Sequence, residues 1–161
     1  MKEIKYEFTL KVFDDLRSLS GVEKKLIEKA ISARENADAK YSNFKVGSAV
    51  LLENGKIIKG SNQENAVFPL GLCAERVALS SAINNYPFIP VTALALSTQK
   101  KLKKDEMAVF PCGICRQALV EQEARFGNKI KLYITGSNNK IFVIDSVSDI
   151  LPFAFGDESL I

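Results

Sequence analysis

Residues 111–117 read Pro-Cys-Gly-Ile-Cys-Arg-Gln, and residues 73–76, earlier in the chain, read Cys-Ala-Glu-Arg. These two stretches contain all three cysteines of the chain, which has no histidine. A Cys-x-x-Cys pair with a distant third cysteine indicates a zinc site, and a structural zinc normally takes all four ligands from cysteine or histidine. Because only three such ligands exist here, we expect the fourth position to be left to water, as a catalytic zinc requires.

We expect both motifs at helix starts, with the second helix running from Cys112 to near Gly127. Unpaired N–H groups and the helix dipole favour anions there, so thiols ionise and bind metal. Cys112 and Cys115 project to one side of a turn, so Cys73 must come from a neighbouring helix. Glu75 can then approach the open zinc position without ligating and carry protons, although alone it would be assigned to dipole stabilisation.

Arg76 and Arg116 each directly follow a residue of these clusters. Three thiolates give a zinc site a net charge of about −1, which weakens its Lewis acidity. We hypothesise that the two guanidinium groups donate to the thiolate sulfurs and restore some of that acidity; surface salt bridges are the alternative.

Composition excludes several classes of protein. The 161 residues suit one compact domain, and a net charge of +3, spread along the chain, is no footprint of nucleic-acid binding. The short basic run at residues 100–104 is expected to be a solvated loop. Without a membrane-spanning stretch or a signal core, we expect a cytoplasmic protein with reduced, metal-bound thiols and no membrane partner. Without histidine, proton transfer falls to a carboxylate or to metal-bound water.

Hydrophobic periodicity predicts helices interleaved with strands. Helices are expected over residues 22–33, 73–82 and 112–127, with a short one around 146–151. Strands are expected over residues 46–52, 56–60, 91–96, 130–135 and 141–145, with a hairpin turn at Asn54-Gly55, a polar loop over 97–110, a turn at 137–139, and an added edge strand within residues 6–13. This order predicts an α/β fold, a three-layer α/β/α sandwich with a mixed, about five-stranded sheet.

The motifs resemble those of the zinc-dependent cytidine deaminases, in the all-cysteine, homotetrameric branch of that family. The resemblance covers roughly residues 22–156 and includes Tyr41-Ser-Asn-Phe-Lys-Val-Gly47, Asn62-Gln-Glu-Asn65 and Leu151-Pro-Phe-Ala-Phe155. It implies a cytidine deaminase-like catalytic domain over residues 22–161, preceded by an N-terminal extension over residues 1–21, and a homotetramer whose active sites are shared between subunits.

The resemblance also implies a role for each matched residue. Cys73, Cys112 and Cys115 would bind one zinc per subunit, and Glu75 would be the proton shuttle. The substrate would be contacted by Phe44 packing on the nucleoside, Asn62 and Glu64 at the ribose hydroxyls, backbone near Ala74 at the pyrimidine edge, and Phe155 from the adjacent chain. Without this resemblance, the sequence would suggest that Phe44 is a core residue, that Asn62 and Glu64 are polar residues facing solvent, and that Phe155 is a packing anchor.

The implied reaction is hydrolytic deamination of cytidine and deoxycytidine to uridine, deoxyuridine and ammonia, as in pyrimidine salvage. Zinc would acidify a water; Glu75 would take its proton, protonate ring N3, and next shuttle a further proton to the departing ammonia. Two alternatives stay open. The substrate could be another cytosine compound, such as the nucleoside antibiotic blasticidin S or a cytosine in a polynucleotide. A structural zinc module with Asp or Glu as the fourth ligand would serve interactions only.

Overall fold

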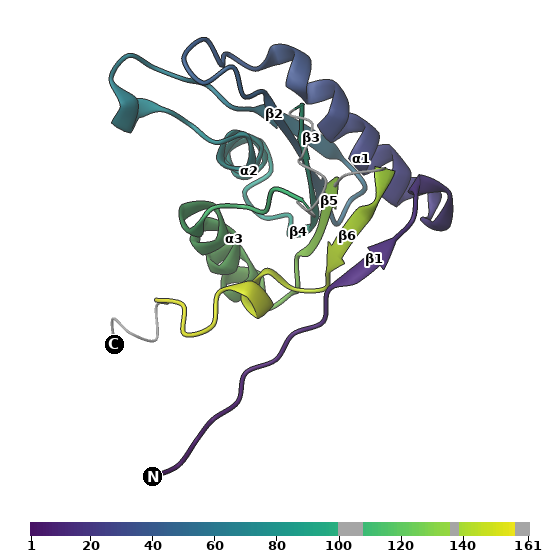
Figure 1. The fold of residues 1–161 in the computed structure, drawn as a ribbon, viewed down its shortest axis with the longest axis vertical. Coiled ribbons are helices and arrows are strands. Elements are labelled where there is room, and N and C mark those ends of the chain that lie inside the picture. Colours follow the sequence, from purple (N-terminus) through teal and green to yellow (C-terminus); the bar gives the residue numbers. More distant parts are fainter. Residues whose placement is uncertain (100–107, 136–138, 157–161) are drawn as a thin grey trace.

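The protein is described here by a computed structural model, which covers residues 1–99, 108–135 and 139–156 (Figure 1). In this part of the chain, six strands form one sheet in the order β1-β6-β5-β4-β2-β3. Their bounds are β1 (Lys11–Phe13), β2 (Val46–Leu52), β3 (Ile57–Ser61), β4 (Val91–Thr98), β5 (Lys131–Thr135) and β6 (Ile141–Ile144). Strands β4 and β5 pair in parallel and the other neighbours pair antiparallel, so the sheet is mixed, as predicted.

Helices cover both faces of this sheet (Figure 1). Helix α1 (Gly21–Ala33) packs on one face, and α2 (Ala74–Asn85) and α3 (Gly113–Phe126) lie on the other. Short 3-10 helices are η1 (Leu16–Ser18), η2 (Arg34–Asn36), η3 (Phe68–Leu70) and η5 (Val147–Ile150). The predicted three-layer α/β/α sandwich is confirmed.

Local signals in the sequence explain where these elements begin and end. Helix α1 starts with a capping box in which Ser20 and Glu23 bond each other's backbone N–H groups. Helix α3 ends at Gly127, whose φ of 64° is the left-handed conformation that glycine adopts at little cost. The β2–β3 hairpin turns at Gly55, with a φ of 82°.

The core has two halves, one on each side of the sheet. Leu94 and Leu96 of β4 belong to the cluster beneath α2 and α3, whereas Ala93 and Ala95 belong to the cluster beneath α1. This alternation follows from the two-residue period of a strand. The sheet is therefore buried on both faces and forms a rigid platform.

Helix α2 lies directly on β3 because Gly60 has no side chain. A Cβ atom at Gly60 would lie 2.3 Å from the Ala78 nitrogen and 2.5 Å from the Ala74 carbonyl oxygen. The first two turns of α2 thus rest against the strand backbone. This contact fixes the height of Cys73 and Glu75 above the sheet.

The structure differs from the sequence-based expectations at the chain ends. The edge strand expected within residues 6–13 comprises Lys11–Phe13, which pairs antiparallel with residues 141–143 of β6. It accounts for the sixth strand, and residues 1–10 extend beyond the sheet (Figure 1). The predicted terminal helix is the 3-10 helix η5. Strand β4 runs on to Thr98, while the expected basic run at 100–104 and most of the 137–139 turn lie outside the described residues.

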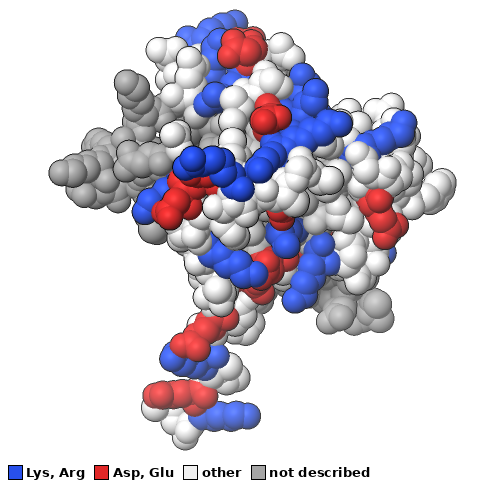
Figure 2. Space-filling model, turned by 90° about the vertical axis from the view of Figure 1, so that its right-hand side faces the viewer, with Lys and Arg blue, Asp and Glu red and all other residues white. Residues whose placement is uncertain are grey.

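Charge is mixed on the face that carries α1 and β1. Figure 2 shows basic and acidic side chains lying among one another there and along the N-terminal segment. None of the helices in the described ranges is both long and apolar enough to cross a membrane.

Candidate active site

The three cysteines converge from two adjacent helices. Cys73 is the N-cap of α2 and Cys112 the N-cap of α3, while Cys115 lies in the first turn of α3. Their sulfur atoms all lie within 4.8 Å of one another, and the Cys112 and Cys115 sulfurs are 3.5 Å apart. Thiolates around a tetrahedral zinc are separated by about 3.8 Å, given Zn–S bonds of about 2.3 Å. The cluster therefore fits a zinc ion held by three protein ligands.

The thiols differ in their tendency to ionise. The hydrogen bond from the Cys115 thiol lowers the pKa of Cys73 to about 6, with smaller contributions from Cys112 and the positive charge of Arg76. The bond to Cys73 and burial raise the pKa of Cys115. Cys73 therefore ionises more readily than Cys115, and thiolates are the form that binds metal.

Glu75 lies beside this cluster and is only 6% exposed. Burial is the main cause that raises the pKa of its carboxyl above the ordinary range, and the negative charge of Cys73 adds to the effect. A carboxyl with a raised pKa can both accept and return a proton near neutral pH. Among the described residues, the group able to hold a metal contains the cysteines and no carboxylate.

A cavity of about 310 Å³ opens next to Glu75. It brings together most of the residues predicted from the sequence, namely Phe44, Asn62, Glu64, Cys73, Ala74, Glu75 and Cys112. Its volume lies within the range of small-molecule sites. Cys115 is buried behind it in the cysteine cluster, and Arg76, Arg116 and Phe155 do not line it.

The polar wall of the cavity is held by hydrogen bonds within the chain. The Asn62 side-chain oxygen accepts from the Val46 N–H at 2.8 Å, and its amide donates to the Phe44 carbonyl at 3.0 Å. Each group keeps capacity for one more partner. Asn62 therefore holds the segment that carries Phe44 and remains able to bind a ligand.

Glu64 is oriented by the turn at residues 41–42. Its carboxylate accepts from the Tyr41 N–H at 2.7 Å, from the Ser42 N–H at 3.2 Å and from the Ser42 hydroxyl. The Ser42 hydroxyl is the main cause that keeps the pKa of Glu64 below its ordinary value. Glu64 thus presents a fixed, ionised acceptor at the cavity.

Arg116 contacts the backbone near the cysteines. Its guanidinium donates to the Pro111 carbonyl at 2.8 Å and to the Ile150 carbonyl at 2.9 Å. It therefore ties the start of α3 to the C-terminal segment, whereas Arg76 acts on Cys73 through its charge. Donation by either arginine to a zinc-bound sulfur stays a prediction.

Sequence reasoning missed part of the cavity wall. The apolar residues that it did not predict are Val46, Leu72, Leu96, Val109 and Phe110. Residues 109–110 directly precede the Pro111-Cys112 motif, and that adjacency is a signal that could have found them. Leu96 is a core residue by pattern, and its place at the site depends on how α2 and α3 lie on the sheet.

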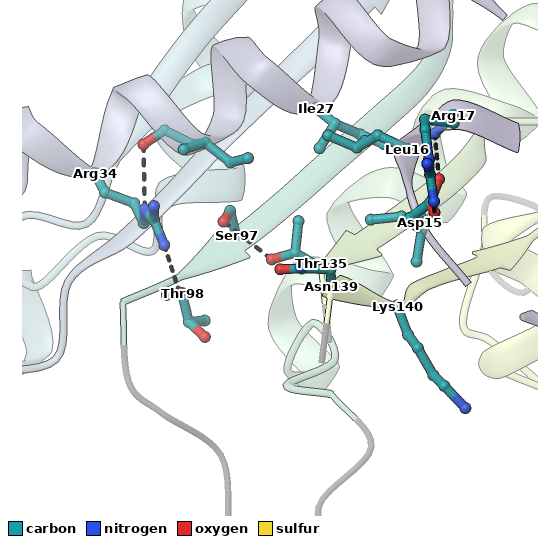
Figure 3. A pocket seen from close by; sticks show the side chains of 12 residues that line it. Asp15, Leu16, Arg17, Ile27, Arg34, Ser97, Thr98, Thr135, Asn139 and Lys140 are labelled. Atoms are coloured by element: carbon teal, nitrogen blue, oxygen red, sulfur yellow. Dashed lines mark hydrogen bonds and ion pairs between the residues drawn. The ribbon is translucent and has the colours of Figure 1, made fainter. Parts of the chain in front are cut away.

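A larger cavity, of about 620 Å³, lies between α1 and the ends of β4 and β5 (Figure 3). Its polar groups bond one another: Arg34 donates to the Thr98 carbonyl at 2.7 Å, and the Thr135 hydroxyl donates to that of Ser97 at 3.0 Å. No cysteine is among the residues that line it. Size alone therefore does not mark the chemical site in this molecule.

Known proteins share both the fold and the site-bearing sequence. Residues 21–126 match the family model of the cytidine and deoxycytidylate deaminase zinc-binding region. The chain is 38% identical to a cytidine deaminase of Halalkalibacterium halodurans, over 84% of this chain and 95% of that protein. A cytidine deaminase of Sporosarcina psychrophila is 37% identical, over 84% of this chain and 93% of that protein.

Solved structures agree with this relationship. The crystal structure of cytidine deaminase from Burkholderia pseudomallei superposes with a TM-score of 0.72 and 37% identity, covering 85% of this chain and all of that one. That from Mycobacterium tuberculosis gives a TM-score of 0.65 and 29% identity, covering 83% of this chain and 97% of that one.

A sandwich fold with a three-cysteine cluster beside a buried glutamate defines a zinc-dependent hydrolytic deaminase. More particularly, the chain belongs to the cytidine and deoxycytidylate deaminase family. Its three cysteines, without histidine, fit the all-cysteine branch of that family.

Proposed function

We propose that this protein deaminates cytidine and deoxycytidine to uridine and deoxyuridine with release of ammonia, in pyrimidine salvage. The observation that carries the proposal is the single cavity whose wall contains Glu75 and two of the clustered cysteines as well as Asn62 and Glu64. The names of the relatives, cytidine deaminases that match over most of their length, support the same substrate class.

In this proposal Cys73, Cys112 and Cys115 hold one zinc ion. The metal, when bound, supplies the Lewis acidity that makes a water nucleophilic near neutral pH. Glu75 accepts the proton of that water and delivers it to ring N3 of the pyrimidine. It then takes the proton of the hydroxyl that has added to C4 and passes it to the departing amine, so that the C4–N bond breaks and the C4 carbonyl forms.

The remaining cavity residues orient the nucleoside. Asn62 and Glu64 bind the ribose hydroxyls with the hydrogen-bonding capacity that their internal contacts leave free. Phe44 packs against the nucleoside, and backbone groups near Ala74 read the edge of the pyrimidine. A substrate without a ribose would lose the contacts to Asn62 and Glu64.

The alternative functions have less support. A structural zinc module needs a fourth protein ligand, and in the described residues the metal-binding group contains the three cysteines alone. A polynucleotide substrate would favour a basic groove, whereas the described residues that line the cavity include Glu64 and Glu75 and no lysine or arginine. A substrate panel distinguishes cytidine from another cytosine nucleoside, such as blasticidin S, as the substrate.

We also propose a homotetramer with shared active sites, in which Phe155 closes over the base in an adjacent chain. Phe155 is 61% exposed and does not line the cavity of its own chain, which supports a role in another subunit. We also propose that the catalytic domain spans residues 22–161, after an extension over 1–21; the family match over residues 21–126 supports the start of that domain. Free thiols at a zinc site fit a reducing compartment, the cytoplasm.

The direct test follows cytidine turnover by ultraviolet absorbance, with and without a zinc chelator. Untreated protein should convert cytidine and deoxycytidine, chelation should abolish turnover, and added zinc should restore it. Cytosine, blasticidin S and a cytosine-containing oligonucleotide serve as competing substrates. A zinc-loaded protein that is inert toward both nucleosides would refute the proposal.

A further inference from the structure

Glu123 is a buried carboxylate outside the cavity. It lies on α3 and is 8% exposed. One carboxylate oxygen accepts from the Ile130 N–H at 2.6 Å, the Ser146 hydroxyl at 2.9 Å and the Val147 N–H at 3.0 Å. The other accepts from the Ser146 hydroxyl at 3.0 Å, the Ser148 N–H at 3.1 Å and the Ser148 hydroxyl.

These donors are all uncharged. Among the described residues, the ion pairs do not include Glu123. A buried carboxylate without a cation is stable only where hydrogen bonds replace its hydration. The convergence of five donor groups on Glu123 is therefore a built anchor for the start of η5.

Two further side chains of α3 extend this attachment toward the cysteines. Arg116 donates to the Ile150 carbonyl at 2.9 Å, and Gln117 donates to the Phe155 carbonyl at 2.7 Å. The C-terminal segment, residues 146–155, is thus held at its start by Glu123, at Ile150 by Arg116 and at its end by Gln117. The helix that carries Cys112 and Cys115 also carries the attachments of this segment.

The segment is held in a conformation that is costly by itself. Phe153 has a φ of 59°, which is unusual for a bulky aromatic residue, and its side chain is 92% exposed. Nothing buried by Phe153 compensates for this conformation. The attachments on either side of Phe153 therefore set the direction in which the end of the segment projects.

We propose that Glu123 is a positioning residue for the nucleoside site. It anchors the C-terminal segment on α3 and so determines where the Phe155 side chain projects. This inference rests on the proposed function, in which Phe155 closes over the base in an adjacent chain. Glu123 itself does not touch the substrate.

The test compares Glu123→Gln with Glu121→Gln, which alters an exposed carboxylate of the same helix. In Glu123→Gln an NH2 group replaces one carboxylate oxygen. This group donates, so it cannot accept the hydrogen bonds that now converge on that oxygen of Glu123. A misplaced Phe155 would lose a contact that stabilises the bound substrate and the transition state equally, and such a loss raises KM without lowering kcat. We therefore expect KM for cytidine to rise about tenfold in Glu123→Gln and kcat to change less than about threefold. Zinc content should be unchanged, and Glu121→Gln should match the wild type.

A double-mutant cycle separates positioning from general stability. If Glu123 acts through Phe155, Glu123→Gln combined with Phe155→Ala should raise KM no more than about twofold beyond Phe155→Ala alone. If the two substitutions raise KM by independent factors that multiply in the double variant, the inference is overturned. An unchanged KM in Glu123→Gln would also overturn it. If Glu123→Gln fails to fold, Ser148→Ala, which removes one donor, carries the same test.

Hydrogen exchange gives a readout that needs no substrate. The Val147 and Ser148 amides, which donate to Glu123, should exchange faster in Glu123→Gln than in Glu121→Gln. If the wild type does not deaminate cytidine, the proposed function fails while this exchange still reports whether the anchor exists. Unchanged exchange at both amides would refute the anchor itself.

Discussion

Glu75 and Glu123 are both buried carboxylates, and their surroundings suit them to different roles. Hydrogen-bond donors from two segments of the chain, Ile130 and residues 146–148, surround Glu123, so its oxygens have little capacity left for a ligand. Glu75 instead lines the cavity, and burial raises the pKa of its carboxyl. Burial with donors anchors the backbone, whereas burial beside a cavity leaves a group free to move protons.

Replacing Glu75 with glutamine should therefore abolish proton transfer and leave the zinc content unchanged. The amide cannot carry a proton, so kcat for cytidine should fall by about 10²–10⁴-fold, the usual contribution of acid–base catalysis. Steady-state kinetics and metal analysis on the same preparation measure both quantities. A zinc-loaded Glu75→Gln protein that turns over like the wild type would contradict the assignment.

At the scale of elements, two helices each pack on a strand through a close backbone contact at a glycine. Gly60 lets α2 rest on β3, and Gly47 lets α1 rest on β2, where a Cβ would lie 2.2 Å from the Ala30 carbonyl oxygen. In both places the obstructing atoms belong to the backbone and cannot rotate away. The positions of Cys73 and Glu75 therefore depend on a residue that carries no functional group.

Gly60→Ala tests this dependence. The added methyl group should push α2 off β3, lower the free energy of unfolding by about 1–3 kcal/mol as in other overpacked cores, and weaken zinc retention. Gly21→Ala is the matched control, because a Cβ there has no atom within 4 Å. Thermal unfolding and zinc titration report both effects, and equal behaviour of the two variants would argue against the contact.

Helix α1 is attached to β5 by a polar contact, because the Tyr133 hydroxyl donates to Glu23. Burial works to raise the pKa of Glu23, but the bonds from Tyr133 and Ser20 outweigh it and hold that pKa below 4.5. A depressed carboxyl pKa stabilises the fold above the unfolded-state value, and this contribution is lost as pH falls through the folded-state value.

Tyr133→Phe should therefore reduce the free energy of unfolding at pH 7 by about 1 kcal/mol, a modest value because Glu23 is partly exposed. The difference from the wild type should be constant above about pH 5 and shrink toward pH 3. Denaturant unfolding at several pH values measures it. A difference that grows on acidification would show that the contact acts differently.

At the scale of the whole molecule, the chain leaves large aromatic side chains in solvent. Phe68 is 73% exposed, Phe153 92% and Phe155 61%. Aromatic side chains of this size would gain free energy if another subunit covered them and removed their surface from water. This is the physical reason to expect that one chain completes the site of another.

Mixed oligomers test the sharing of sites. Chains with Glu75→Gln and chains with Phe155→Ala can be co-expressed with different tags and purified together. The Phe155→Ala chain keeps a functional Glu75, and the Glu75→Gln chain can supply the intact Phe155 to that site. The KM of the mixed oligomer should therefore be about tenfold lower than that of Phe155→Ala alone. A KM that stays at the Phe155→Ala value would show that each chain completes its own site.

The sequence by itself determined the features that depend on residues a few positions apart. Cys112 and Cys115 on one turn and the Asn54-Gly55 hairpin are local, and the structure has them where they were expected. Caps, turns and ligand spacings are governed by short-range backbone geometry, which a single sequence states directly.

Only the tertiary structure decided the features that join distant segments. The anchor at Glu123 joins α3 to residues 146–148, the cavity wall takes Leu96 from the sheet, and β1 pairs with the distant strand β6. Glu123 has the sequence pattern of an ordinary helix residue, and only the packing of α3 against η5 buries it. Burial and long-range hydrogen bonds depend on the relative placement of whole elements, which no local pattern encodes.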